Sequence, residues 1–140
     1  MYKFPKVKMN SDGLFGPTLN NRFYKAVHYH NKSSTFSSNK TRWVLKKNEQ
    51  YEVFRVSDAN DWMCNNTRGL FSILNNGAII LGENEERLSF FPEPSNVSDA
   101  WHGYPVNSCE CEPSIALVDK WLEENIIDER IHIKILKGQL

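Results

Sequence analysis

The stretch from Arg87 to Val106, RLSFFPEPSNVSDAWHGYPV, constrains the fold most, because a short apolar segment runs directly into a loop dense in proline and aromatic residues. Its prolines are Pro92, Pro94 and Pro105. Each proline fixes its own φ and lacks a backbone donor, so the loop has little backbone freedom. It holds the planar side chains of residues 101–104, WHGY, close together. We therefore expect either a fixed recognition surface or a plug over the core.

The aromatic residues of this loop favour a loop that packs over the core, whereas its histidine favours a ligand-binding or catalytic site. Trp101 and Tyr104 belong to residue types that are mostly buried and that dominate core packing. If they face solvent instead, they offer flat walls beside His102, and Gly103 leaves room for a ligand or a backbone to approach. In that second interpretation, Trp101 and His102 contact a ligand.

The length and composition fit one globular domain, residues 1–140, large enough to bury a core. The N-terminal MYKFPKVKMN is interrupted by lysine and proline before any apolar run develops, so it does not resemble a signal peptide. No apolar window approaches the length that spans a bilayer. Three cysteines fit a reducing compartment better than a disulfide scaffold. We expect a cytoplasmic protein with no membrane association.

The zero net charge hides a strong asymmetry along the chain. Residues 1–50 contain ten Lys or Arg against two acids, about +8, whereas residues 51–140 contain seven against fifteen, about −8. The two halves either neutralise each other across an internal interface or present two faces to solvent. Partial neutralisation is the expectation for a single domain, and an exposed basic face would suit phosphates.

The N-terminal segment has weak structural signals. Residues 1–10 alternate aromatic and lysine residues, which predicts an edge strand or a mobile arm. Helical and strand periods compete from Leu19 to His30, and the β-favouring residue types predict a strand over Arg22–Tyr29. Residues 31–40, NKSSTFSSNK, are polar, basic and serine-rich, which predicts a flexible loop.

Strand signals are clearest in the middle of the chain. Arg42–Leu45 and Tyr51–Val56, separated by a polar stretch, predict a hairpin. Leu70–Leu74 and Ala78–Leu81 flank Asn75-Asn76-Gly77, whose residues tolerate the positive φ of a tight turn, and they predict a second hairpin. A further strand over residues 87–91 completes an antiparallel meander that leads into the proline loop.

The C-terminal segment predicts helices. An apolar stripe, Leu117, Val118, Trp121 and Leu122, follows Pro113-Ser114 and predicts a helix that ends near Asn125. Residues 128–140 fit either a strand or a short helix, and the cap residues favour a helix over 128–137. The predicted fold is therefore α+β, with an antiparallel sheet of about five strands and one or two C-terminal helices packed on it.

Metal-binding patterns are weak in this sequence. Three cysteines and one histidine could in number supply the four ligands of a zinc ion: Cys64, Cys109, Cys111 and His102. However, the C-x-C spacing without paired C-x-x-C elements favours free cysteines. His28 and His30 would share one face of a strand, where they suit a phosphate or a metal, but they have no third ligand nearby. We expect no metal and no cofactor.

The sequence has no nucleophile elbow, no phosphate-binding glycine loop and no H-E-x-x-H motif. The one acid–base candidate is His102, with Asp99 and Tyr104 close enough in sequence to orient it. The same three residues fit a local turn network in which Asp99 caps a backbone N–H.

Three functions remain open. The leading interpretation is a small cytoplasmic binding protein without catalysis, which contacts a protein partner through the loop at 92–106 and the basic N-terminal half. The alternative is an enzyme acting on a nucleotide or nucleic acid, with His102 as acid or base and Arg22, His28 or Arg42 binding phosphate. The second alternative is a binder of single-stranded nucleic acid, because the first half interleaves aromatic and basic residues.

Overall fold

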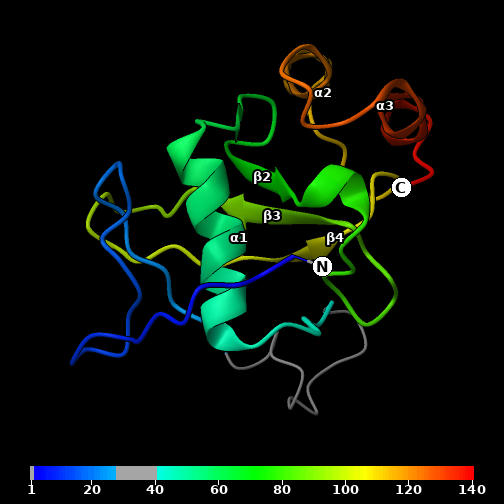
Figure 1. The fold of residues 1–140 in the computed structure, drawn as a ribbon. Coiled ribbons are helices and arrows are strands. Elements are labelled where there is room, and N and C mark those ends of the chain that lie inside the picture. Colours follow the sequence, from blue (N-terminus) through cyan, green and yellow to red (C-terminus); the bar gives the residue numbers. More distant parts are fainter. Residues whose placement is uncertain (1, 28–40) are drawn as a thin grey trace.

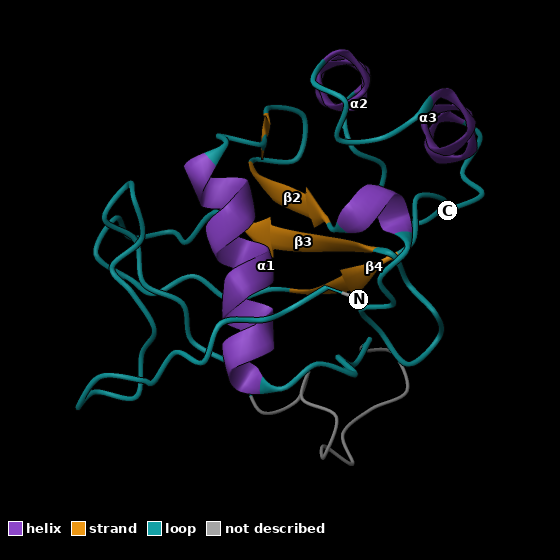
Figure 2. Ribbon diagram, viewed as in Figure 1, coloured by secondary structure: helices purple, strands orange, loops and turns teal. Residues whose placement is uncertain are grey.

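The computed structural model describes residues 2–27 and 41–140, and in this part of the chain the fold is α+β (Figures 1 and 2). Four antiparallel strands form one sheet in the order β1-β2-β3-β4. The elements in chain order are α1 (Lys47–Ala59), β1 (Met63–Cys64), β2 (Gly69–Ile73), the 3-10 turn η2 (Asn75–Gly77), β3 (Leu88–Pro92), β4 (Tyr104–Val106), α2 (Ile115–Glu123) and α3 (Glu129–Leu136). The predicted class is confirmed, although the sheet has four strands rather than about five.

The sheet separates two hydrophobic clusters, because successive side chains of a strand point to opposite faces. On one face, Leu70 of β2 and Phe91 of β3 pack with Phe54 of α1. On the other face, Phe71 of β2 packs with Trp121 of α2 and with residues of α3. The helix α1 therefore lies against one face and the pair α2 and α3 against the other. Figure 1 shows α1 in front of the strands and the pair α2 and α3 above β2 in that view.

Helix α1 occupies the segment for which the sequence predicted a hairpin, so that prediction is wrong. The backbone N–H of Lys46 donates to the Glu49 carboxylate at 2.8 Å, which makes the polar KKNE stretch the start of a helix rather than a turn. The buried residues of α1 are one full turn, residues 50–54, and two residues a turn later: Gln50, Tyr51, Glu52, Val53, Phe54, Ser57 and Asp58. The burial of these residues against the sheet overrides the β-propensity of Tyr, Val and Phe.

The second predicted hairpin is also wrong, because β2 pairs with β3 and not with residues 78–81. Phe71 lies opposite Phe90, and the turn residues Asn75 and Asn76 do have positive φ, at 49° and 57°. They form η2, however, and the chain then continues through residues 78–81 outside any strand before it returns as β3. The strand predicted at 87–91 is confirmed as β3.

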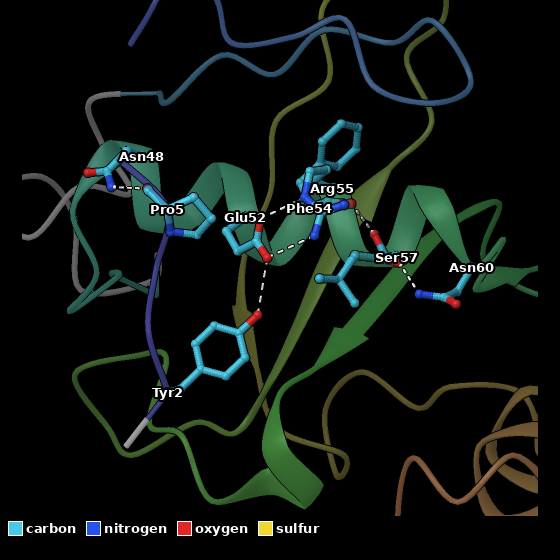
Figure 3. Close-up of polar contacts among 9 residues, drawn as sticks. Tyr2, Pro5, Asn48, Glu52, Phe54, Arg55, Ser57 and Asn60 are labelled. Atoms are coloured by element: carbon cyan, nitrogen blue, oxygen red, sulfur yellow. Dashed lines mark hydrogen bonds and ion pairs between the residues drawn. The ribbon is translucent and has the colours of Figure 1, made fainter. Parts of the chain in front are cut away.

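The N-terminal segment is fixed to the domain without forming a strand. Tyr24 makes isolated bridges to Phe15 and to Trp101, so the strand predicted over Arg22–Tyr29 is absent from residues 22–27; its last two positions lie outside the described residues. Residues 2–10 form no strand. The Tyr2 hydroxyl donates to Glu52 at 3.2 Å, and Figure 3 shows the N-terminal segment crossing α1, with Pro5 beside Asn48 near the start of the helix. The loop predicted at 31–40 is not among the described residues.

Both C-terminal helices are confirmed, and each begins at a side-chain cap. The Ser114 hydroxyl accepts from the backbone N–H of Leu117 at 3.3 Å, and the Asp128 carboxylate accepts from that of Ile131 at 2.9 Å. Residues 128–140 therefore start with a helix, not a strand. Trp121 of α2 meets Trp62 edge-to-face at 5.6 Å, which ties this helix to the core.

Within the described part of the chain, none of the helices combines the length and apolarity that crossing a membrane requires.

Candidate functional site

At Trp101 the proline loop packs into the core, as the plug interpretation expected. The indole is 5% exposed and packs on Phe54 of α1 with ring centroids 5.7 Å apart. Its backbone is also held, because the N–H of Trp101 donates to Phe23 and its carbonyl accepts from Lys25. Trp101 therefore packs in the core beneath the loop surface. It does not form the ligand-facing wall that one interpretation of the sequence expected.

Gly103 and Tyr104 belong to the same packed layer. A Cβ on Gly103 would overlap the ring of Phe91, so the space beside this glycine is filled by the protein core and is not open to a ligand. The Trp43 indole N–H donates to the Gly103 carbonyl at 3.0 Å. Tyr104 begins β4, and its ring meets Phe90 edge-to-face at 6.2 Å.

His102 points the other way and lines a cleft of about 600 Å³ between the proline loop and the N-terminal segment. The lining residues are Leu14, Lys25, Pro92, Glu93, Pro94, Ser95, Asp99, Ala100 and His102. Burial, and secondly the positive charge of Lys25, lower the pKa of His102 below its usual value. The neutral form of the imidazole is therefore favoured, and its Nδ1 is buried with no hydrogen-bond partner in residues 2–27 and 41–140.

The proposed acid–base trio is only partly brought together. Asp99 and His102 line the same cleft, whereas Tyr104 is not among its lining residues. The Asp99 carboxylate accepts from the Asn96 amide at 3.3 Å, and the backbone N–H of Asp99 donates to the Asn96 carbonyl at 3.1 Å. No hydrogen bond joins Asp99 to His102 in the part of the chain that the structure describes. Asp99 thus belongs to a turn with Asn96, in which its carboxylate accepts from a side-chain amide rather than from the backbone N–H that the turn-network interpretation assigned to it.

Arg22 has a structural role. Its guanidinium lies 3.0 Å from the fully buried carboxylate of Asp58 and 4.9 Å above the Trp101 ring. It thereby connects α1, the N-terminal segment and the proline loop. Arg42 lies 3.9 Å from Glu83. His28 and His30, the other predicted phosphate ligands, lie outside the described residues.

The cysteines are free thiols. Residues 2–27 and 41–140 contain no group of three or more His, Cys, Asp or Glu side chains suited to a metal ion. Burial raises the pKa of Cys64, but hydrogen bonds from Thr67 and from nearby backbone groups outweigh it and leave that pKa below its usual value. Burial and the neighbouring Cys64 raise the pKa of Cys111 to about 11.

Sequence reasoning missed Lys25 and Leu14 as cleft residues. Lys25 was visible as one of ten basic residues in the first half, but nothing in its local sequence distinguishes it from the others. Its position follows from the bridge between Tyr24 and Trp101, which brings the N-terminal segment beside the proline loop. Such a pairing of distant segments leaves no periodic signal.

The fold and the cleft together define an α+β domain with a mixed-charge cleft between the proline loop and the N-terminal segment. Comparison of the chain with protein-family models, with curated proteins and with solved structures finds no match in any of the three.

Proposed function

We propose that this protein is a non-catalytic binding domain that holds a short peptide segment of a partner protein in the cleft between Lys25 and His102. The observation that carries the proposal is the cleft itself, about 600 Å³ with mixed lining. Proline and alanine side chains supply apolar walls, and Lys25, Glu93 and Asp99 supply charges of both signs. Peptides carry apolar side chains and charges of both signs, and so match such a lining.

The rigidity of the loop supports this proposal. Trp101 is buried and Gly103 is tightly packed, so the loop backbone has little freedom left to lose when a ligand binds. Val97, at the tip of the same loop, is fully exposed and offers an apolar contact close to the cleft. The buried Nδ1 of His102 has no hydrogen-bond partner among the described residues, and a small rearrangement on binding would satisfy it.

A peptide library displayed on phage tests the proposal. Peptides enriched on the wild-type protein should bind at least about tenfold more weakly to Lys25→Glu and to His102→Ala, because both variants alter the cleft. Lys47→Glu is the matched control, since it makes the same charge change on an exposed residue outside the cleft. Failure to enrich any peptide, or equal affinity for all variants, would refute the proposal.

One observation favours the enzyme as a second candidate. A neutral histidine beside Lys25 in a cleft can accept a proton while the lysine binds a phosphate. Hydrolysis of a chromogenic phosphodiester by the wild type, lost in His102→Ala, would support this candidate over simple binding. The nucleic-acid binder has weaker support, since Arg22 and Arg42 both have carboxylate neighbours.

A further inference from the structure

A second cleft, of about 350 Å³, lies where α3 and the last residues of the chain meet the η2 turn. It shares no lining residue with the His102 cleft. Three basic side chains line it: Arg87, Arg130 and Lys134. All three belong to the half of the sequence with net charge about −8, so the charge count along the chain gives no sign of this concentration of positive charge.

Arg87 is held in a fixed orientation at this cleft. Its guanidinium donates to the Gly77 carbonyl at 2.8 Å and, through Nε, to the Glu85 carbonyl at 3.3 Å. Both acceptors are neutral backbone oxygens, so the positive charge of Arg87 is oriented without being neutralised. A guanidinium fixed in this way keeps N–H groups for a further acceptor and loses little side-chain entropy on binding.

Arg130 and Lys134 lie four positions apart on α3 and therefore share one face of this helix. Among the described residues, neither forms an ion pair. Of the described side chains that line the cleft, only that of Glu85 is acidic; Asp128, at the start of α3, has its carboxylate engaged by Ile131 and by the Asn76 amide. The lining side chains therefore carry three positive charges against one negative charge.

The walls of the cleft are tied together. Asp128 and Asn76 exchange two hydrogen bonds, of 2.9 and 3.0 Å, which join the start of α3 to η2. The positive φ of Gly77 turns the backbone so that its carbonyl reaches Arg87. Arg87, bonded to Gly77 of η2, is consequently held in a fixed position relative to the basic residues of α3.

We propose that this cleft binds a single phosphate group, carried by a small phosphate monoester. Arginine guanidinium groups match the geometry of phosphate oxygens, and a lysine ammonium adds a point charge. The size of the cleft fits a small metabolite, at the lower end of ordinary ligand pockets. The proposal is independent of the peptide-binding function, because the two clefts have no residue in common.

The acidic surface next to the basic cleft favours a phosphate monoester over a nucleic acid as the ligand. An adjoining cleft of about 700 Å³ shares Glu85 with the basic cleft and is also lined by Glu86 and Glu110. A polyanion that continued in that direction would meet these carboxylates and be repelled. A ligand with one phosphate and a neutral or cationic remainder avoids this cost.

Titration of the full chain with inorganic phosphate and with glycerol 3-phosphate, followed by calorimetry and by amide NMR shifts at low salt, tests the proposal. We expect saturable binding of both, with shifts at Gly77 and along α3, and no response to glycerol. Arg130→Glu and Lys134→Glu should each lower the affinity for the ester by about tenfold or more. Both residues lack described hydrogen bonds or ion pairs, so the variants should fold, which circular dichroism verifies.

Lys137→Glu is the matched control, because it makes the same charge change at the end of α3 but outside the cleft. It should bind the ester as the wild type does. The proposal is overturned if the wild type shows no saturable response to phosphate, or if Lys137→Glu weakens binding as much as Lys134→Glu. Tighter binding of a single-stranded oligonucleotide at the same residues would overturn the assignment to a monoester.

Discussion

Gly103 illustrates how closely the proline loop fits the sheet. Gly103→Ala should lower the free energy of unfolding by about 1 to 3 kcal/mol, because the new methyl group would overlap the Phe91 ring and approach the Phe90 carbonyl. Urea denaturation measures the loss. Gly13→Ala serves as the comparison, since its Cβ would meet open space and only its positive φ of 76° costs energy, about 1 kcal/mol. A loss at Gly103 no larger than at Gly13 would contradict the packing argument.

His102 should make stability depend on pH in a defined direction. Its pKa is lowered in the folded state, so below the ordinary histidine value of 6.5 the unfolded chain binds more protons than the folded one. The stabilisation is therefore complete above that value and is lost as the pH falls through the folded pKa. Urea unfolding at pH 7.5 and pH 5 should show a larger decrease for the wild type than for His102→Gln. Equal decreases would mean that His102 titrates normally.

At the scale of single elements, the caps explain why the C-terminal helices were predictable. Ser114→Ala should destabilise the protein by about 1 kcal/mol, because the N–H of Leu117 loses its acceptor at the start of α2. Ser114→Asp, which keeps a cap oxygen, should retain most of the stability. Thermal unfolding compares the three proteins, and an alanine variant as stable as the wild type would show that the cap contributes nothing.

Sequence reasoning succeeded where the signal is local and failed where tertiary contacts decide. The cap residues Ser114 and Asp128 directly precede the helices that they predict. The apolar run that predicts β3 lies within the strand itself. In α1, four of the seven buried residues are polar, including Gln50 and Asp58, so the buried side of the helix does not show in the sequence as an apolar face. Of the residues that line the His102 cleft, the sequence predicted only those of the proline loop. Lys25 was not predicted, because it is brought to the cleft by the bridge between Tyr24 and Trp101, which are far apart in the sequence.

At the scale of the whole molecule, Asp58 holds three segments together. Its buried carboxylate lies 3.0 Å from Arg22 and also accepts from the backbone of Asn20, while Arg22 covers Trp101. Asp58→Ala should cost about 3 kcal/mol, because it removes a charge partner from a mostly buried pair. Hydrogen exchange should also speed up at Trp101 and Lys25, far along the chain from the substitution.

The exposed pair of Arg68 and Glu93, 3.2 Å apart, provides the control for this prediction. Arg68→Gln should change stability by less than about 0.5 kcal/mol, since the arginine side chain is 81% exposed. If Asp58→Ala proves as mild as Arg68→Gln, the Arg22–Asp58 pair does not hold the segments together.

The hydrogen bond from the Trp43 indole to Gly103 also bears on how the protein is made. The two residues are 60 positions apart, so this hydrogen bond cannot form during synthesis until 60 further residues have been added after Trp43. At translation rates of about 5 to 20 residues per second, this interval is about 3 to 12 s. Until Gly103 is made, Trp43, which is fully buried in the finished fold, lacks this hydrogen-bond acceptor. We therefore expect a chaperone that acts on the nascent chain to bind the segment around Trp43.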